Sequence, residues 1–378
     1  MSKNKQKSPI KYINNGTYGC VLRPAIPCDS TSKSDSNTVS KIFKSSSSIR
    51  KEHKENARIS KLIDPESIFT VAELDSCIID LLQIPEKEFR KCKNFSLQEL
   101  KRKKQPQLIY EYGGQDLNVA STISSFEDIF IGMETLFIGL KSLESHKYAH
   151  MDIKPANIVY NSENKKVSLI DFGLLKNFSE IYTRKNIRTL EYKYPYYPPE
   201  FVACYNFFQS TANKKANYIS VSNNFIELYD KYIKLITIHA PPLIKTEIDK
   251  VFDSKIINNY FNQLDDMSNS KDFDKFCRRY ANRIDVYSLG ASLAKLMGFC
   301  CYYNTLTNKQ ASSLPLFYSS VIKLIRDMLI INPKERLTPT QAYKRYIKVL
   351  SIIKKECPPG KVINPKTGRC IKESNLKK

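Results

Sequence analysis

Short apolar runs, interrupted by glycine and polar residues, predict β-strands in the first third of the chain. The stretch from Tyr12 to Phe43 is strand-like, and its polar segment 29–37 suits a hairpin loop. Residues 50–62 then repeat apolar positions at helical spacing, with Ile59 and Leu62 on one face and charges on the other. The chain therefore begins with a strand region followed by an amphipathic helix.

Beyond this helix the strand pattern continues only in two fragments. Residues 69–71 and 108–112 are short, apolar and rich in β-formers, so each predicts a strand. The Lys-rich stretch between them fits neither period, and we interpret residues 75–105 as an insertion.

The pattern becomes helical after Ser124. Ser124 and Glu127 are spaced as a capping box, and the helix that they would start runs to Ser145. Its apolar positions are Ile129, Phe130, Met133, Phe137, Leu140 and Leu143. Two short strands follow at 158–159 and 167–170, and helical periodicity returns from Asp285 to Ile353.

A polar, Asn-rich segment at 205–282 separates these two parts and contains two helical runs. The apolar positions of these runs are Phe225, Leu228, Tyr229, Tyr232 and Leu235, and then Ile248, Val251, Phe252, Ile256 and Tyr260. We interpret the segment as an inserted, packed helical bundle, with a docking surface as the alternative.

Composition narrows the classes of protein that the chain can belong to. Hydrophobic residues make up 42 % of the 378 residues, which is enough for a core and excludes wholesale disorder. The net charge of +22 indicates an anionic partner, such as nucleic acid or a phosphate-rich ligand, unless it reflects an AT-rich genome. Ten scattered cysteines are too sparse for a disulfide framework, so a reducing, intracellular environment is expected. The basic N-terminus is not a secretory signal, and the longest apolar runs are too short to span a membrane.

The strongest chemical signal is the segment 150–157, His-Met-Asp-Ile-Lys-Pro-Ala-Asn, followed after a strand by Asp171-Phe172-Gly173. Asp152 and Asn157 lie on one short loop, and a hairpin-like pair of strands would bring Asp171 toward them. Two carboxylates and an amide oxygen are hard ligands suited to Mg²⁺, and Lys154 can neutralise a transferring phosphoryl group.

These motifs resemble those of eukaryotic-type protein kinases. The resemblance implies that Asp152 is the catalytic base, that Asn157 and Asp171 bind the metal, and that Lys154 contacts phosphate as in Ser/Thr kinases. It also implies an α+β, two-lobed protein kinase fold, with a small β-rich N-lobe and a large helical C-lobe that carries the helical insertion. The expected cofactors are ATP and Mg²⁺, with Mn²⁺ as an alternative metal.

Residues 13–21 resemble the glycine-rich loop of that family. Gly16 and Gly19 would let the backbone approach the ATP phosphates, and Val21 would cover the adenine. Asn14 replaces the first glycine, and Asn tolerates positive φ better than most residues.

The strand at 39–42 resembles the one that bears the ATP-anchoring lysine, which is Lys41 by its spacing, with Lys44 as a competitor. For the ion-pairing glutamate of the following helix we favour Glu55, because Ile59 and Leu62 follow it at +4 and +7. Glu52 is the alternative, because helix register alone does not exclude it.

Residues 108–114 resemble the hinge between the lobes. Backbone groups of Glu111 and Tyr112 would bind the adenine edge, and Tyr110 would narrow the back of that pocket. Three architectural features follow from the same resemblance. They are the end of the activation segment at Pro198-Pro199-Glu200, the start of the central helix at Asp285, and Arg336, which would pair with Glu200 in the core.

Two departures from the family pattern bear on regulation and specificity. Met151 replaces the usual arginine, so activity is not expected to require phosphorylation of the activation loop. Residues 192–197 lack the threonine that normally lies on the substrate side. The sequence therefore does not decide between specificity for Ser/Thr and dual specificity.

The C-terminal segment, 354–378, carries eight basic and two acidic residues. Cys357 and Cys370 flank turn-forming residues and resemble the two-cysteine adaptor motif of large DNA viruses, iridoviruses among them. The segment could tether the chain to another protein or to nucleic acid. We therefore expect a basic arm at 1–9, a kinase domain at 10–353 divided into an N-lobe at 10–112 and a C-lobe at 113–353, and this tail.

The sequence thus predicts an ATP-dependent Ser/Thr protein kinase of a virus. It is expected to act on viral or host proteins and not to bind a membrane. Its expected location is the host cytoplasm or the virion. The alternatives are a catalytically weak scaffold with a kinase fold, which acts through the insertion and the tail, and a small-molecule phosphotransferase.

Overall fold

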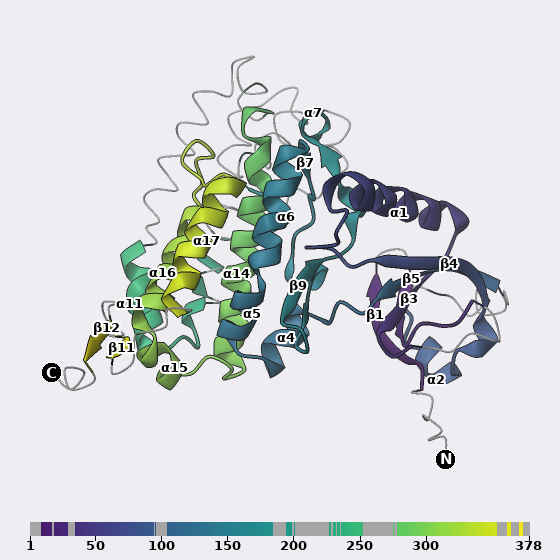
Figure 1. The fold of residues 1–378 in the computed structure, drawn as a ribbon, viewed down its shortest axis with the longest axis horizontal. Coiled ribbons are helices and arrows are strands. Elements are labelled where there is room, and N and C mark those ends of the chain that lie inside the picture. Colours follow the sequence, from purple (N-terminus) through teal and green to yellow (C-terminus); the bar gives the residue numbers. More distant parts are fainter. Residues whose placement is uncertain are drawn as a thin grey trace. The chain divides into compact units, whose positions relative to one another are not determined.

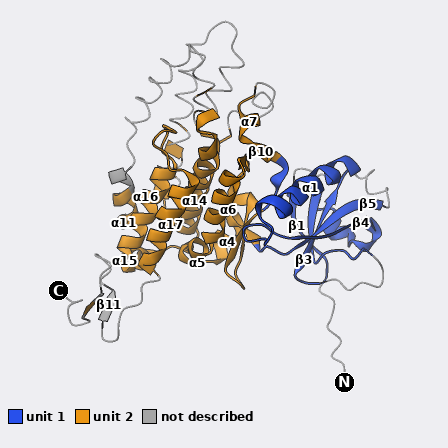
Figure 2. Ribbon diagram, turned by 45° about the horizontal axis from the view of Figure 1, so that its top comes forward, with its two compact units in different colours: residues 1–114, 170–173 blue, residues 115–169, 174–378 orange. Residues whose placement is uncertain are grey.

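The chain folds into two compact units, which are described separately (Figures 1 and 2). The first comprises residues 1–114 and 170–173, and the second comprises residues 115–169 and 174–378. The computed structural model describes residues 9–16, 19–28, 35–93, 95, 104–183, 194–198, 200, 227, 230–231, 233–234, 236–251, 275, 278–353, 361–363 and 370–372.

A five-stranded antiparallel sheet forms the first unit, in the order β1-β2-β3-β5-β4. Its strands are β1 Lys11–Gly16, β2 Gly19–Arg23, β3 Thr38–Phe43, β4 Glu73–Asp80 and β5 Lys104–Glu111. The strand region expected between Tyr12 and Phe43 is therefore confirmed, and its polar segment connects β2 to β3.

Residues 75–105, which we interpret as an insertion, contain a strand that the sequence pattern did not predict. Strand β4 lies at the sheet edge and pairs with β5 from Glu73–Tyr110 to Asp80–Lys104. The 3₁₀ helix η2 Leu81–Gln83 and the helix α2 Glu86–Phe89 follow it. The segment contributes Ile79, Leu81, Ile84, Phe89, Cys92 and Phe95 to the core. The pattern was obscured because β4 exposes Leu74 and Ile78 to solvent, as an edge strand can. The strand predicted at 69–71 amounts to one bridging residue, Thr70.

Helix α1, Ser46–Arg58, follows β3 and continues into the π-helical turn η1, Ile59–Ile63. Ser45 caps α1 by accepting a hydrogen bond from the backbone N–H of Ser48 at 3.2 Å. Glu52 is the only buried residue of α1, whereas η1 buries Ile59 and Ile63. The helix thus contacts the sheet through few apolar side chains.

Two disulfides close within the first unit, which overturns the expectation that the cysteines stay unpaired. Cys20 pairs with Cys92 and Cys28 with Cys77, with Cα–Cα distances of 5.6 and 5.7 Å. The partners are 72 and 49 residues apart, so sequence spacing gave no sign of the pairing. Among the described residues, Cys300 and Cys301 are the free cysteines, and both are buried.

The second unit is mainly helical, with two small sheets at the start and a hairpin at the end. Its helices are α4 Leu117–Ile123, α5 Phe126–Gly132, α6 Glu134–Ser145, η3 Pro155–Asn157, α7 Phe178–Ile181, α11 Pro242–Val251, η5 Ala281–Arg283, α14 Ile284–Tyr302, α15 Asn308–Ser313, α16 Pro315–Met328 and α17 Pro339–Ile353. Its strands are β6 Gln115–Asp116, β7 Tyr148–Ala149, β8 Ile158–Asn161, β9 Lys166–Leu169, β10 Lys176–Asn177, β11 Lys361–Ile363 and β12 Cys370–Lys372. A further 3₁₀ turn, η4 Phe172–Leu174, begins in residues of the first unit.

Helix α14 is the centre of the second unit. It is long and apolar enough to cross a membrane, yet 89 % of that apolar stretch is buried inside the fold, as expected for a core helix. Helices α4, α5 and α16 contact it along its length (Figure 1). The predicted helical region after Asp285 is therefore confirmed.

Two details of the helix that we predicted from Ser124 differ in the structure. The cap is Ser125, whose hydroxyl accepts from the backbone N–H of Asp128 at 3.1 Å, one residue later than expected. The helix is also interrupted at Met133, where α5 ends and α6 begins. The two predicted strands are confirmed as the β8–β9 hairpin.

The insertion and the tail lie partly outside the described residues. Of the two helical runs predicted in 205–282, the second is helical from Pro242 to Val251, whereas Phe225, Leu228, Tyr229, Tyr232 and Leu235 are not among the described residues. In the tail, β11 and β12 form an antiparallel hairpin, as the turn-forming residues between the cysteines indicate. Cys357 lies outside the described residues.

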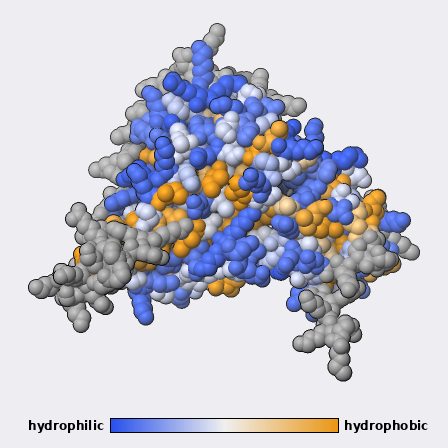
Figure 3. Space-filling model, in the orientation of Figure 1, coloured by the Kyte–Doolittle hydropathy of each residue, from blue (hydrophilic) through white to orange (hydrophobic). Residues whose placement is uncertain are grey.

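Polar residues cover most of the face shown in Figure 3, with apolar patches on both units. Among the most exposed apolar side chains are Leu82 at 77 %, Ile123 at 68 % and Ile78 at 64 %. Scattered apolar side chains of this kind are ordinary for a folded protein.

Removing the disulfide between Cys20 and Cys92 should destabilise the first unit. We expect the double variant Cys20→Ala, Cys92→Ala to lose about 2–5 kcal/mol of unfolding free energy, because the link restricts a long loop in the unfolded chain. Peptide mapping without reductant should recover Cys20–Cys92 and Cys28–Cys77 as linked pairs. Alkylation of all four cysteines in unreduced, denatured protein would contradict the pairing.

Candidate active site

Lys41 and Glu52 form a buried ion pair in the first unit. The Lys41 ammonium donates to both Glu52 carboxylate oxygens, at 2.7 and 2.6 Å. Their side chains are 10 % and 9 % exposed, so the two charges stabilise each other away from water. The competing Lys44 is exposed, with its ammonium 5.9 Å from the centre of the Phe95 ring. The structure therefore favours Lys41 as the anchoring lysine.

Our assignment of Glu55 as the partner of Lys41 is wrong. Glu55 instead accepts from Arg58 at 2.9 Å on the same helix. The register was misjudged because we took Leu62 as a core residue, but Leu62 is 60 % exposed. The buried residues are instead Glu52, Ile59 and Ile63, which are spaced at +7 and +4 and therefore share one face of the helix.

The glycine-rich segment forms the β1–β2 hairpin, in which Gly16 lies opposite Gly19. Residues 17–18 at its tip lie outside the described residues. Gly19 has to be glycine, because an added Cβ would lie 1.8 Å from the Ile42 carbonyl oxygen. Val21 lies directly opposite Lys41 on the neighbouring strand, so both residues are on the same face of the sheet. Asn14 lies in β1 beside a bulge rather than in left-handed backbone.

The expected hinge segment includes the end of β5, where the backbone N–H groups of both Glu111 and Tyr112 donate within the first unit. The backbone N–H of Tyr112 donates to the Asn37 carbonyl at 2.6 Å, so it is already used within the unit. The Tyr112 ring instead faces the Arg23 guanidinium at 3.4 Å. Tyr110 is half-buried, and its hydroxyl donates to Glu52 at 2.8 Å. Glu111 exposes its side chain while its N–H donates to Ala72 at 3.0 Å.

Asp171 belongs with the first unit, at the point where residues 170–173 join it. Its φ of 63° lies in the left-handed region, which is strained for a residue other than glycine. Burial raises the pKa of Glu52, the Lys41 charge lowers it, and the Asp171 charge raises it. Asp171 is therefore electrostatically coupled to the Lys41–Glu52 pair.

In the second unit, Asp285 at the start of α14 holds the loop that carries the strongest motif. Its carboxylate accepts the backbone N–H groups of His150 at 2.6 Å and Met151 at 3.1 Å. Met151 is buried, with a φ of 66°, and His150 Nδ1 in turn accepts the backbone N–H of Asp152 at 3.2 Å. The backbone is thus fixed immediately before Asp152.

Asp152, Lys154 and Asn157 come together as predicted. Asp152 Oδ2 accepts from the Lys154 ammonium at 2.9 Å and from the Asn157 amide at 2.8 Å. The same amide donates to the Asp152 carbonyl at 2.9 Å. The loop therefore orients one carboxylate oxygen with two donors and leaves Oδ1 directed elsewhere.

The sequence analysis missed Tyr194, whose hydroxyl donates to Asp152 Oδ1 at 2.6 Å. Burial and then the Asp152 carboxylate raise the pKa of Tyr194, so the phenol stays protonated and acts as a donor. The Tyr194 ring contacts those of Tyr196 and Tyr197 at centroid distances of 5.3 and 4.9 Å. The tyrosine-rich segment that lacked a threonine was the available signal.

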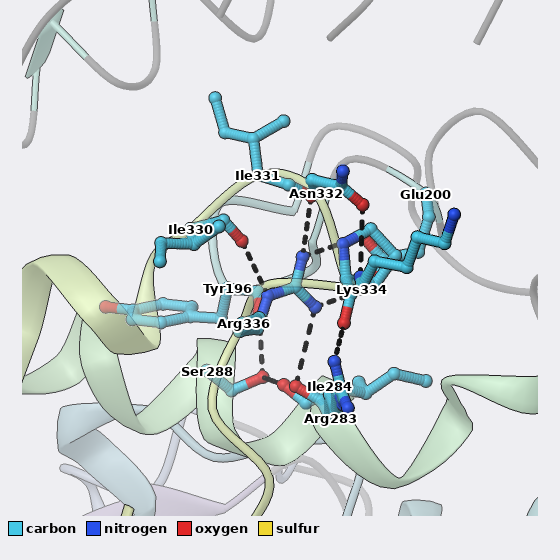
Figure 4. A network of polar contacts seen from close by, with 11 residues as sticks. Tyr196, Glu200, Arg283, Ile284, Ser288, Ile330, Ile331, Asn332, Lys334 and Arg336 are labelled. Carbon is cyan, nitrogen blue, oxygen red and sulfur yellow. Dashed lines mark hydrogen bonds and ion pairs between the residues drawn. The ribbon is translucent and has the colours of Figure 1, made fainter. Parts of the chain in front are cut away.

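The segment that carries these tyrosines is anchored at Glu200. Arg336 donates to both Glu200 carboxylate oxygens, at 2.6 and 2.8 Å, and both side chains are fully buried (Figure 4). Arg336 also donates to the carbonyls of Ile330 and Ile331, at 2.8 and 3.0 Å. The predicted pairing of Arg336 with Glu200 is therefore confirmed. Ser288 of α14 adds a hydrogen bond to the Tyr196 carbonyl at 2.8 Å.

The chemistry of the donors fits the expected metal. Asn157 offers an amide oxygen and Asp171 a carboxylate, and both are hard ligands of the kind that Mg²⁺ prefers. Asn157 is 6 % exposed, and its amide nitrogen is already used by Asp152, which orients the side chain. Asn157 lies in the second unit and Asp171 in the first.

Comparison with known proteins shows which proteins the chain is similar to. A family model described as "Protein kinase domain" matches residues 13–347. Cell division control protein 2 homolog 2 of Trypanosoma brucei brucei is 35 % identical over 97 residues, which cover 23 % of this chain and 27 % of the relative. Mitogen-activated protein kinase kinase kinase 8 of Rattus norvegicus is 32 % identical over 145 residues, 34 % of this chain and 29 % of the relative. Mitogen-activated protein kinase 13 of Arabidopsis thaliana is 27 % identical over 180 residues, 47 % of this chain and 43 % of the relative. The chain thus spans less than half the length of each of these relatives.

The corrected ion pair leads to a comparison between two glutamates of α1. Glu52→Gln should weaken ATP binding about tenfold, because it leaves the Lys41 charge buried beside a neutral amide. Glu55→Gln removes only a partly exposed contact with Arg58, so it should bind ATP within about twofold of wild type. Calorimetric titration of both variants with ATP tests this. Stronger loss in Glu55→Gln than in Glu52→Gln would reverse the assignment.

Proposed function

The chain belongs to the protein kinase family, and we propose that it transfers the γ-phosphate of ATP to Ser and Thr hydroxyls of protein substrates. The observation that carries this proposal is the hydrogen bonding of Asp152. Lys154 and Asn157 hold one carboxylate oxygen, and Tyr194 meets the other at 2.6 Å. A carboxylate oriented in this way can accept the proton of an attacking hydroxyl.

The proposed roles follow from what each side chain can donate or accept. Asp152 orients the hydroxyl and accepts its proton, while Lys154, which already donates to Asp152, offers positive charge to the transferring phosphoryl group. In the first unit, Lys41 binds ATP phosphates and Glu52 keeps the Lys41 ammonium in place. Val21 covers the adenine, and the backbone of Glu111 binds its edge. Gly113 is the next backbone donor along the chain after Tyr112.

Asn157 and Asp171 would hold the metal ion, which we propose to be Mg²⁺. When bound, it would neutralise phosphate charge during transfer. The contribution of the chain is to orient these ligands: Asn157 through its two hydrogen bonds to Asp152, and Asp171 through its left-handed backbone.

Tyr194 bears on substrate choice. In the family pattern, a threonine hydroxyl lies on the substrate side, and here the Tyr194 hydroxyl reaches Asp152 from that segment. We infer that Tyr194 supplies the same hydrogen bond from a bulkier side chain. This supports a preference for Ser and Thr, because the space beside Asp152 is already lined by the rings of Tyr194 and Tyr196.

The alternative is a catalytically weak scaffold that acts through its insertion and tail. The joint presence of Lys41, Asp152, Asn157 and Asp171 argues against it, since a scaffold needs none of them together. The buried Glu200–Arg336 pair favours a protein kinase over a small-molecule phosphotransferase. Because Met151 replaces the usual arginine, we propose that activity does not depend on activation-loop phosphorylation.

Origin and partners extend the proposal further. We propose a viral source from the two-cysteine tail and the AT-rich composition, and a role for the basic tail in binding another protein or nucleic acid. Pull-downs with the full chain and with residues 354–378 removed would test the tail, and identical partner sets would exclude that role.

Mutation of the two acidic site residues tests the reaction. Asp152→Asn and Asp171→Asn should each lower phosphate incorporation from γ-labelled ATP at least about 10²-fold, because they remove the base and a metal ligand. The matched control, Asp128→Asn, removes an exposed carboxylate that pairs with Lys165, and should retain activity.

The assay should offer casein, a basic protein and the chain itself, with Mg²⁺ or Mn²⁺. Incorporation by wild type no higher than by Asp152→Asn on every protein would refute the proposed function. Label on small molecules alone would favour the phosphotransferase instead.

Tyr194→Phe tests the inferred role of the tyrosine hydroxyl. We expect kcat for a peptide substrate to fall about three- to tenfold, the effect of losing one hydrogen bond to a charged group. The KM for ATP should stay unchanged, since the hydroxyl that is removed donates to Asp152. Tyr302→Phe, which alters an exposed tyrosine of α14, is the control. A rise in kcat would show that Tyr194 obstructs the substrate rather than orienting Asp152.

A further inference from the structure

A continuous chain of hydrogen bonds leads away from the Lys41–Glu52 pair across the first unit. Glu52 Oε1 accepts the Tyr110 hydroxyl at 2.8 Å, in addition to the Lys41 ammonium. The Tyr110 oxygen in turn accepts the Asn56 amide at 2.8 Å. The two residues that contact Glu52 directly therefore come from β3 and β5, and Asn56 comes from the next turn of α1.

The path of hydrogen bonds continues from Asn56 to the edge strand β4. The Asn56 amide also donates to Glu73 Oε2 at 2.6 Å. The other carboxylate oxygen of Glu73 contacts His53 Nδ1, whose side chain is 57 % exposed. The path thus begins at the buried Lys41 and ends at the surface, and it links α1 to both β4 and β5.

The donors and acceptors along this path are mutually consistent. Tyr110 donates its one proton to Glu52 and accepts from Asn56, and Asn56 uses its amide nitrogen for Tyr110 and Glu73. Burial, and then the charges of Glu52 and Glu73, raise the pKa of Tyr110. Tyr110 therefore remains a neutral donor, which satisfies Glu52 without adding a charge.

Helix α1 has few buried side chains. Glu52 is the only buried residue among its 13 residues, and the next apolar anchors, Ile59 and Ile63, lie beyond it in η1. A helix with a continuous apolar face would stay packed on a sheet even if one side chain were changed. Here the position of α1, and with it that of Glu52, depends on polar contacts.

We propose that Tyr110, Asn56 and Glu73 are positioning residues that brace Glu52 against Lys41 and thereby set the affinity for ATP. This inference rests on the proposed function, because it assigns the Lys41–Glu52 pair to ATP binding. None of the three residues needs to touch ATP, since each acts through Glu52.

Three variants separate the links of the brace. Tyr110→Phe removes the hydroxyl and keeps the ring, Asn56→Ala removes the amide, and a third variant combines both. Tyr343→Phe, which removes a hydroxyl from α17 in the second unit, is the matched control. Circular dichroism and thermal unfolding of each variant verify that it is folded.

ATP affinity is measured by calorimetric titration, and KM and kcat by phosphate incorporation. We expect Tyr110→Phe to weaken ATP binding about five- to tenfold, with the KM for the peptide unchanged. The double variant should bind ATP about as weakly as Tyr110→Phe alone, because Asn56 acts through the Tyr110 hydroxyl. Tyr343→Phe should match wild type.

The pH profile supplies a readout that a general loss of packing would not move. The titratable groups that act on Glu52 are those of Lys41, Tyr110 and Asp171. Those of Glu73 and His53 lie further along the path of hydrogen bonds. Loss of the Tyr110 donor raises the pKa of Glu52, since a hydrogen bond to the carboxylate favours its charged form. The acidic limb of kcat/KM for ATP should therefore move to higher pH in Tyr110→Phe.

The brace would be overturned if a folded Tyr110→Phe kept both its ATP affinity and its acidic limb. It would also be overturned if the losses of ATP affinity in the two single variants multiplied in the double variant. The proposed function can fail separately. If wild type binds ATP but phosphorylates no protein, the calorimetric comparison still tests the brace. If wild type is active and the variants match it, the brace alone is refuted.

Discussion

One buried carboxylate, that of Asp285, holds the loop that carries Asp152 in the second unit. It lies at the start of the central helix α14 and accepts two successive backbone N–H groups, those of His150 and Met151. Burial raises its pKa, whereas His150 and the two hydrogen bonds lower it. Because Met151 has left-handed backbone, the loop needs this external support to keep its shape. The orientation of Asp152 follows from that support.

The same helix also receives the segment that ends at Glu200. Ser288 of α14 holds the Tyr196 carbonyl, and Arg336 holds the Glu200 carboxylate with two parallel hydrogen bonds. Breaking a buried pair of this kind by removing one partner costs about 3–5 kcal/mol, because a charge is left without a partner. Helix α14 therefore holds both the tyrosine segment, through Ser288, and the loop that carries Asp152, through Asp285.

The parts of the site that a local motif encodes could be predicted from the sequence. Asp152, Lys154 and Asn157 are close along the chain, so their meeting needs only one loop. Glu52 was missed because Leu62, at +7 from Glu55, looks like a core position but is exposed, whereas the buried Ile59 and Ile63 lie at +7 and +11 from Glu52. The disulfides were missed because their partners lie far apart in the sequence, and the β4 edge strand was missed because its exposed Leu74 and Ile78 obscure the strand pattern.

Glu52 and Asp152 each accept a tyrosine hydroxyl that sequence reasoning did not assign to them. Tyr110 donates to Glu52 in the first unit, and Tyr194 donates to Asp152 in the second. Each carboxylate already has a lysine partner, and a second lysine would bring another buried charge and compete for the same oxygens. A phenol whose pKa is raised by burial supplies a hydrogen bond and stays neutral. The two units thus orient a carboxylate that already has a lysine partner with the same second donor, a neutral tyrosine hydroxyl.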